Sequence, residues 1–304
     1  MSINILIEAI KEKNNPTVAG LDSRLDYVPQ FIKDAAFNLH GETFKGAVEA
    51  ILQFNKILID NLCDIVPAIK PQSACYEMYG YEGIRALEET VSYAQVKGLY
   101  VIADAKRNDI GVSAEAYATA FLGETKISDN TSLSALGADS VTVNGYLGID
   151  GISPFLKYDK CIFVLAKTSN TSSGEVQDKS IGEYTVYQHM AYLADQWGKD
   201  SIGKYGYNNV GIVVGATYPE QIEELRKQSP NTYFLIPGYG AQGGGAKDVA
   251  GAFNEDGLGA IINASRSIMC AYKKSNRPTE EFGLAARDEA IKMRDDILSV
   301  INKD

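Results

Sequence analysis

The sequence predicts an α/β fold, a single (β/α)8 TIM barrel over residues 1–304, and three observations support it. Eight short apolar runs recur along the chain, helical patterns separate them, and polar residues follow most of them. The runs are continuously apolar rather than alternating, which is typical of parallel strands buried on both faces. Strand–helix alternation repeated eight times favours a closed barrel.

The eight apolar runs give the expected strands in chain order. They lie at residues 18–22, 68–72, 99–106, 140–145, 161–169, 210–216, 233–240 and 259–266. Each is short and rich in β-branched or other apolar residues, as buried strands are.

Amphipathic stretches between the runs predict the helices. Apolar residues recur near helical spacing in 47–66, and 83–97 and 183–198 are also expected to be helical. The helix at 219–228 starts with Pro219 and carries Glu220 and Glu223, which suit a helix N-terminus. A long helix rich in paired charges is expected at 280–301.

Two connections are longer than the barrel needs, and they follow strands one and five. Residues 23–67 must hold an added element before the next helix, and 170–209 hold a polar loop and then a helix. Extra length at the top of a barrel usually serves the active site as a lid or binding loop. We therefore expect the polar loop 170–179 to serve the active site as such a lid or binding loop.

Composition excludes several classes of partner. The net charge of −10 and the pI of about 4.9 argue against binding to nucleic acid or to an anionic membrane surface. No apolar run approaches the roughly 20 residues of a membrane span, and the N-terminus lacks the pattern of a signal peptide. The four cysteines contain no C-x-x-C pair, so we expect buried, reduced thiols and a cytoplasmic protein (Cys63, Cys75, Cys161, Cys270).

The sequence predicts neither a metal site nor an organic cofactor. The two histidines, His40 and His189, have no other His or Cys at metal-ligand spacing. The residues after the first strand, Gly20 to Ser23, do not form a dinucleotide-binding fingerprint.

Charged residues gather where the second and third strands are expected to end. Alternation along the third strand places Asp104 and Lys106 on one face, Lys70 ends the neighbouring strand, and Asp109 follows in the loop. Two ammonium groups and two carboxylates would keep each other charged and in place. The alternative is an ion-pair network that only braces the barrel mouth, and Asp109 could instead be a helix N-cap.

Glycine-rich sequence after the last two strands predicts a phosphate site. The seventh strand runs into residues 237–245, which include Gly240 and Gln242, and Arg266 ends the eighth strand. Loops at these positions of a barrel commonly bind phosphate through backbone N–H groups. Other strand ends carry polar residues that could bind substrate, although Asp22 could cap a turn and Asn144 could be a turn residue (Asp22, Asn144, Thr168, Ser169).

These segments resemble the orotidine 5′-phosphate decarboxylase family. Residues 104–111 read D-A-K-R-N-D-I-G and resemble its D-x-K-x-x-D-I-G signature. Residues 237–244 and 266–268 are similar to its phosphate-gripping segments, and 20–22 and 69–70 fall where its first two strands carry functional residues. The long insertions resemble the larger subgroup of the family.

The resemblance implies decarboxylation of orotidine 5′-phosphate to UMP, the last step of de novo pyrimidine biosynthesis, without a cofactor. It implies that Lys106 protonates C6 of the pyrimidine and that Asp104 lies against the departing carboxylate. Lys70 would join the charged network and contact the ribose.

The remaining roles implied by the resemblance concern binding and assembly. Asp22 would bind ribose hydroxyls, Ser169 or Thr168 the pyrimidine edge, and Gln242 and Arg266 the phosphate. Asp109 and Ser113 would reach the site from the other subunit of a homodimer, where Ser113 stands in place of the family's usual threonine.

Two other interpretations remain open at this point. The chain could be another phosphosugar-binding barrel lyase, either of the keto-gulonate-phosphate decarboxylase type or an aldolase that uses a Schiff-base lysine. It could also be a barrel that binds nucleotides without chemistry.

Overall fold

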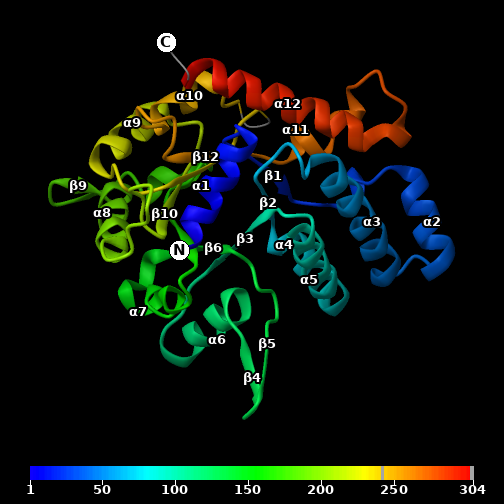
Figure 1. Cartoon of the computed structure of the whole chain (residues 1–304), viewed down its shortest axis with the longest axis horizontal. Helices are drawn as coiled ribbons and strands as arrows, with labels where there is room; N and C mark the ends of the chain where they lie inside the picture. Colours follow the sequence, from blue (N-terminus) through cyan, green and yellow to red (C-terminus); the bar gives the residue numbers. More distant parts are fainter. Residues whose placement is uncertain (241–242, 302–304) are drawn as a thin grey trace.

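A closed barrel of eight parallel strands forms the centre of the computed structural model, which describes residues 1–240 and 243–301 (Figure 1). The strand order is β1-β12-β11-β10-β7-β6-β3-β2. The barrel strands are β1 (Thr17–Leu21), β2 (Ala68–Pro71), β3 (Tyr100–Arg107), β6 (Ser140–Val143), β7 (Cys161–Lys167), β10 (Val210–Val214), β11 (Phe234–Pro237) and β12 (Ala260–Ala264). The predicted (β/α)8 fold is confirmed, with strand ends that differ by a few residues.

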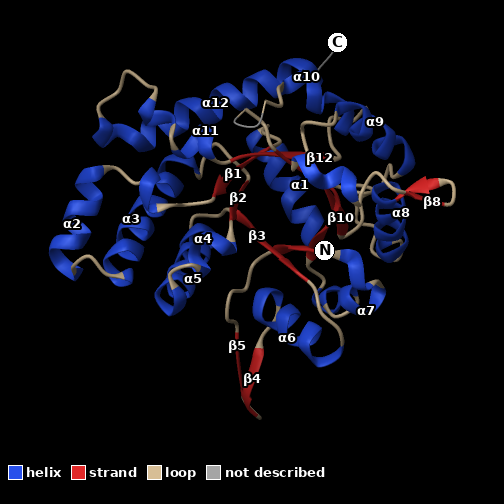
Figure 2. Cartoon of the chain, turned by 180° about the vertical axis from the view of Figure 1, so that it is seen from behind, coloured by secondary structure: helices blue, strands red, loops and turns tan. Residues whose placement is uncertain are grey.

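Helices surround the strands on the outside of the barrel (Figure 2). The longer ones are α3 (Phe44–Leu62), α5 (Gly80–Val96), α6 (Gly111–Leu122), α8 (Val186–Gly198), α9 (Pro219–Gln228) and α12 (Phe282–Ile301). Short helices fill the connections, namely α4 (Ser73–Glu77), α7 (Ile149–Ile152), α10 (Ala246–Val249) and α11 (Arg266–Met269). The helices predicted from periodicity are therefore present, and α9 has the predicted bounds.

Both over-long connections contain added elements. The first holds the 3-10 turn η1 (Leu25–Tyr27) and helix α2 (Gln30–His40). The second holds η4 (Thr171–Glu175) and a small hairpin of β8 (Ser180–Ile181) and β9 (Tyr184–Thr185). The helix expected from residue 183 starts at Val186 because Thr185 forms a capping box with Gln188.

Two elements were missed by the sequence analysis. Helix α1 (Ser2–Lys13) buries Ile3, Leu6, Ile7 and Ile10, whose spacing is helical, against inward-facing barrel residues. It therefore closes the N-terminal end of the barrel. A second hairpin, β4 (Thr125–Ser128) with β5 (Thr131–Leu133), follows α6 and is exposed along its whole length.

The cysteines partly match expectation. All four are free thiols, but only Cys161 is buried, and the other three are partly exposed. Among the described residues, no helix is both long and apolar enough to cross a bilayer.

Arg226 in α9 joins several loops at the N-terminal side of the barrel. Its guanidinium is buried and lies 3.8 Å from the centre of the Phe234 ring, and burial lowers its pKa to about 10, so it stays charged at neutral pH. Within residues 1–240 and 243–301 it forms no ion pair with a carboxylate. It donates instead, over 2.9 to 3.1 Å, to the backbone carbonyls of Ser229, Pro230, Thr232, Ala252 and Gly259.

We expect Arg226→Met to lower the free energy of unfolding by about 3 kcal/mol or more, because it leaves several buried carbonyls without donors. The matched control is Arg287→Met, which removes a more exposed arginine paired with Asp64 and should cost less than about 1 kcal/mol. Urea unfolding of both variants measures the difference. Equal losses would show that the buried carbonyls do not depend on Arg226.

Candidate active site

A cavity of about 690 Å³ opens at the C-terminal ends of the barrel strands. This is the end at which barrel enzymes carry their active sites. Residues at the end of every barrel strand line it, and most of the predicted site residues are among them. The polar residues of the lining include Asp22, Lys70, Gln72, Asp104, Lys106, Thr142, Thr168, Ser169, Asn263, Ser265 and Arg266.

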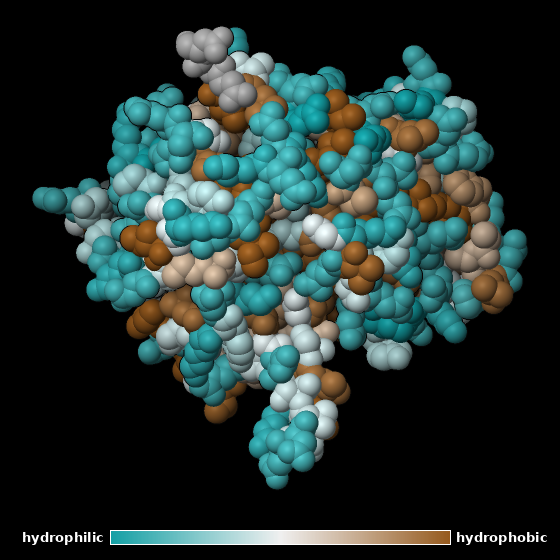
Figure 3. All heavy atoms as spheres, in the orientation of Figure 1, coloured by the Kyte–Doolittle hydropathy of each residue, from teal (hydrophilic) through white to brown (hydrophobic). Residues whose placement is uncertain are grey.

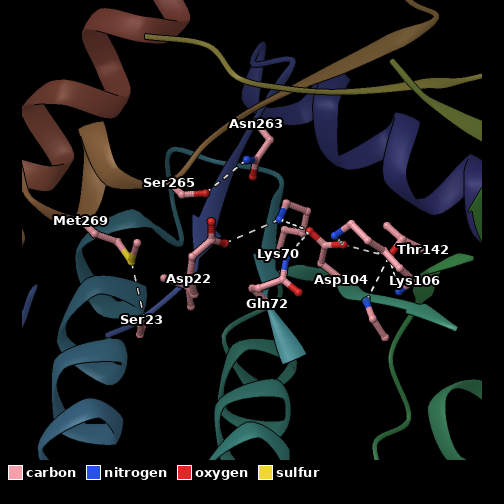
Figure 4. Close-up of polar contacts among 12 residues, drawn as sticks. Asp22, Ser23, Lys70, Gln72, Asp104, Lys106, Thr142, Asn263, Ser265 and Met269 are labelled. Carbon is pink, nitrogen blue, oxygen red and sulfur yellow. Dashed lines mark hydrogen bonds and ion pairs between the residues drawn. The ribbon is translucent and has the colours of Figure 1, made fainter. Parts of the chain in front are cut away.

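An alternating array of charges forms one wall of the cavity (Figure 4). The carboxylate of Asp104 lies between two ammonium groups, with Oδ2 2.6 Å from Nζ of Lys70 and Oδ1 2.5 Å from Nζ of Lys106. Asp22 extends the array, since its Oδ1 lies 3.7 Å from Nζ of Lys70. The side chain of Lys70 is 3% exposed and that of Lys106 is 43% exposed, so Lys106 is the cation that a ligand can reach.

The array keeps its buried members ionised. Burial by itself would raise the pKa of the Asp104 carboxyl, but Lys70 and Lys106 outweigh it and hold that pKa well below its usual value. Burial likewise opposes the charged form of Lys70, yet Asp104 and Asp22 raise the pKa of Lys70 above its usual value. At neutral pH the site therefore contains a fixed carboxylate next to fixed ammonium groups.

A bulge in β3, rather than regular alternation, brings Asp104 and Lys106 together. Ala103 pairs with Val141, but the next pair joins Arg107 to Val143, so β3 has two more residues than β6 between the pairs. Lys106 has a φ of 52°, in the left-handed region that costs a lysine about 1–2 kcal/mol. Asp104 and Lys106 therefore do face the same cavity, as predicted. The predicted reason, regular alternation along the strand, was wrong.

Thr142 in β6 holds this bulge in place. Its Oγ1 accepts hydrogen bonds from the backbone N–H groups of Ala105 and Lys106, both at 3.0 Å, and donates to Oδ1 of Asp104 at 2.9 Å. Thr142 is buried. The sequence analysis did not select it, although a polar residue inside the apolar run 140–143 was an available signal.

After the end of β7, the cavity is lined by the uncharged hydroxyl groups of Thr168 and Ser169. The hydroxyl of Thr168 donates to Asn170 at 2.6 Å and accepts from Gln177 at 2.7 Å, whereas Ser169 has no hydrogen bond through its hydroxyl to the described part of the chain. Ser169 is therefore the freer of the two to bind a ligand.

The loop after β7 is anchored by Lys167, which the sequence analysis also missed. Lys167 is buried, and its Nζ lies 2.6 Å from Oδ1 of Asp178, 3.1 Å from Oγ of Ser173 and 4.4 Å from the centre of the Tyr218 ring. The sequence did contain a signal for it, because Lys167 is a charged residue near the end of an apolar run. The loop expected to close over a ligand is thus tied to the strand that carries Ser169.

The predicted phosphate end lies on the β11 and β12 side of the cavity. Arg266 lines the cavity at the start of α11, and Gly238 of the glycine-rich loop lines it as well. Gly238 and Gly240 have φ values of 103° and 72°, which side chains other than glycine rarely adopt. Gln242 lies outside the described residues.

Among the described residues, four predicted site residues do not line the cavity of this chain, namely Asp109, Ser113, Asn144 and Gly240. Asp109 accepts a hydrogen bond from the N–H of Ile110 but does not cap α6, and Ser113 is exposed on that helix. Asn144 caps a turn by accepting from the N–H of Tyr146 at 3.0 Å, which is the turn role left open above.

The fold and this cavity define a barrel enzyme whose site is built on fixed charges at one end and a glycine-rich loop with Arg266 at the other. Residues 51–277 match the model of the orotidine 5′-phosphate decarboxylase / HUMPS family. The chain belongs to this family.

Curated relatives and a solved structure agree with that assignment. Orotidine 5′-phosphate decarboxylase of Rhodopirellula baltica is 44% identical over 91% of this chain and 89% of its own. The Clostridium kluyveri enzyme of the same name is 38% identical over 99% of this chain and 98% of its own. The structure of Leishmania donovani OMP decarboxylase superposes with a TM-score of 0.74 at 28% identity and covers 100% of this chain and 99% of that one.

We expect Thr142→Val to lower kcat by about 10- to 100-fold with a smaller change in KM, because losing the hydroxyl frees the bulge and displaces the ammonium of Lys106. Steady-state kinetics of orotidine 5′-phosphate decarboxylation, the reaction that gives the family its name, measures the effect. Thr142→Ser keeps the hydroxyl and is the matched control. A valine variant with kcat within twofold of the parent would show that Thr142 does not position Lys106.

Proposed function

We propose that this chain decarboxylates orotidine 5′-phosphate by stabilising a carbanion at C6 with Lys106 and then protonating it. The reaction yields UMP, and the chain is a carboxy-lyase of pyrimidine biosynthesis, as its family and its relatives at 38–44% identity indicate. The observation that carries the mechanism is the position of Asp104 between Lys70 and Lys106 in the cavity wall.

The chemistry explains why a charged site without an electron sink suits this reaction. Loss of CO2 from C6 leaves a lone pair in the plane of the pyrimidine ring, where it cannot delocalise into the ring carbonyls. A fixed ammonium next to C6 stabilises that charge and can donate the proton that replaces CO2. Lys106 has the exposure and the flanking carboxylate for this role, and Asp104 would repel the substrate carboxylate.

The other end of the cavity supplies binding energy remote from the reaction. Arg266 and the loop that includes Gly240 and Gln242 would bind the phosphate dianion, with the arginine fork matching its oxygens. Binding energy at that end can drive closure of loops over the ring and so lower the barrier. Asp22 and Lys70 would contact the ribose, and Ser169 rather than Thr168 would contact the pyrimidine edge.

The alternative chemistries are less well supported. A Schiff-base aldolase needs a lysine that is neutral when it attacks, whereas the array raises the pKa of Lys70. The family model also covers HUMPS enzymes, but the curated relatives cited here are named orotidine 5′-phosphate decarboxylases.

Lys106→Ala should lower kcat by at least about 1,000-fold, because one group supplies both the electrostatic stabilisation and the proton. Nucleotide binding and the fold should be retained. The absorbance decrease of orotidine 5′-phosphate measures turnover, and calorimetry measures UMP binding. The control is Lys97→Ala, which removes a lysine paired with Asp60 on the outer surface. Near-normal turnover of Lys106→Ala would exclude the mechanism.

We also propose that the active enzyme is a homodimer in which Asp109 and Ser113 complete the site of the partner. Both residues lie outside the cavity of their own chain, at the start of α6. Apolar side chains are exposed there, among them Val112, which is 81% exposed, and Tyr146, which is 83% exposed. We call this surface the α6 face, and its exposed apolar residues are Ile110, Val112, Tyr117, Ile127, Leu133, Tyr146, Leu147 and Ile149.

The arrangement of elements supports a second copy as the occupant of the α6 face. Helix α7 packs against the segment that carries Asp109, since a Cβ on Gly151 would meet the side chain of Asn108 and the carbonyl of Asp109. The β4–β5 hairpin projects from the body of the molecule beside α6 (Figures 1 and 3). A lone two-stranded hairpin is marginal in water, and a partner subunit would cover its apolar residues.

Mixing two inactive variants tests the shared site. In a heterodimer of Lys106→Ala and Asp109→Ala chains, one of the two sites has both residues intact. Random pairing of equal amounts should therefore restore about one quarter of the parent activity. The variants are mixed after partial denaturation and refolded together, and each variant refolded alone is the control. No recovery in mixtures that contain heterodimers would show that each site is built from one chain.

We propose the cytoplasm as the compartment. All four cysteines are free thiols, which suits a reducing environment.

A further inference from the structure

Two buried acceptors of the cavity wall have no hydrogen-bond donor in the described part of the chain. They are Oδ1 of Asp22 and Oδ1 of Asn263. Asn263 is the last residue but one of β12 and is 5% exposed, and its amide nitrogen donates to Oγ of Ser265 at 3.3 Å. A buried acceptor left unpaired costs about 1–3 kcal/mol, so the position of the Asn263 oxygen requires an explanation.

The neighbouring strand is shaped to admit the Asn263 side chain. A Cβ on Gly20 of β1 would lie 2.9 Å from Oδ1 of Asn263 and 2.0 Å from Oγ of Ser265. No residue with a side chain fits there without moving both groups. Because Gly20 has no side chain, the side chain of Asn263 can extend over β1. Gly20 in turn pairs with Lys70 of β2, the next strand of the barrel.

Asn263 also lies between the two ends of the predicted substrate site. Arg266, at the phosphate end, follows it by three residues. Asp22 follows the neighbouring strand β1, and Lys70 lies on β2, on the other side of β1 (Figure 4). This is where the sugar that joins phosphate and pyrimidine would lie.

The donors of the substrate decide what this oxygen can bind. At neutral pH, orotidine 5′-phosphate has three hydrogen-bond donors, which are the two ribose hydroxyls and the ring N3–H. Its phosphate, carboxylate and ring carbonyls only accept. The pyrimidine edge is assigned to Ser169, which follows β7, and β7 is separated from β12 by β11 and β10 in the barrel. The ribose hydroxyls are the donors left for the region of β1 and β12.

We propose that Asn263 is a substrate-binding residue whose amide oxygen accepts a hydrogen bond from one ribose hydroxyl, beside Asp22, which accepts from the other. The inference rests on the proposed function. Two acceptors of the same cavity wall match the two hydroxyls of a ribose, and the pair makes Asn263 a residue that selects ribonucleotides over deoxyribonucleotides.

The test compares nucleotides that differ by one hydroxyl. Binding of UMP, 2′-deoxyUMP and 3′-deoxyUMP is measured by calorimetry on the parent protein and on Asn263→Leu, which has a similar shape but no acceptor. Removing the contacted hydroxyl should weaken binding to the parent by about 5- to 150-fold, the range for one unpaired buried acceptor. Asn263→Leu should bind UMP more weakly than the parent does, by a similar factor. It should bind UMP and the deoxynucleotide that lacks the contacted hydroxyl equally well.

Controls separate this contact from other roles of Asn263. Asn61→Leu removes an amide on the outer helix α3 that donates to the carbonyl of Ile57, and it should behave as the parent does. Asn263→Ala serves as a second variant if the leucine does not fold, as judged by thermal unfolding. If Asn263→Leu weakens UMP and both deoxynucleotides by the same factor, the residue supports the charged array instead and the proposal is wrong.

Turnover of orotidine 5′-phosphate by the parent is measured alongside. A parent that binds UMP but releases no CO2 would contradict the proposed function and leave the ribose test valid. The other outcome is normal turnover by the parent together with an Asn263→Leu variant that distinguishes UMP from the deoxynucleotides as well as the parent does. That outcome would contradict only the role of Asn263.

Discussion

The contact between Asp104 and two lysines is the constraint on which the rest of the structure depends. Asp104 and Lys70 are almost fully buried, and each is stable there as an ion only because the other is present. Removing one partner of such a pair usually costs about 3–5 kcal/mol, because a buried charge is left uncompensated. The barrel must therefore bring the ends of β2 and β3 close enough for Lys70 and Asp104 to form a hydrogen bond. Neighbouring parallel strands that end at the same rim of the barrel meet this requirement.

The sequence predicted the parts of the molecule that repeat or that carry strong local signals. The apolar runs predicted all barrel strands, and periodicity with Pro219 predicted α9 to the residue. The charges at the ends of β2 and β3 and Arg266 after β12 were found because parallel strands collect their final residues at one rim.

What could not be predicted depends on contacts between residues distant in sequence. The left-handed backbone of Lys106 and its support by Thr142 follow from a mismatch in length between β3 and β6, which no periodicity reveals. Asn263 lies within an apolar run of the sequence, and only the pairing of β12 with β1 shows that Gly20 makes room for it.

The bulge at Lys106 also bears on how this chain can evolve or be engineered. The backbone strain of a left-handed lysine and the unpaired amide oxygen of Asn263 are costs to folding that the apolar barrel and its helices offset. Substitutions that relax the bulge or fill the cavity with apolar groups would stabilise the empty protein and at the same time disable it. A screen that selects variants by thermal stability alone would therefore accumulate substitutions in the active site. Selection for catalysis keeps the less stable sequence.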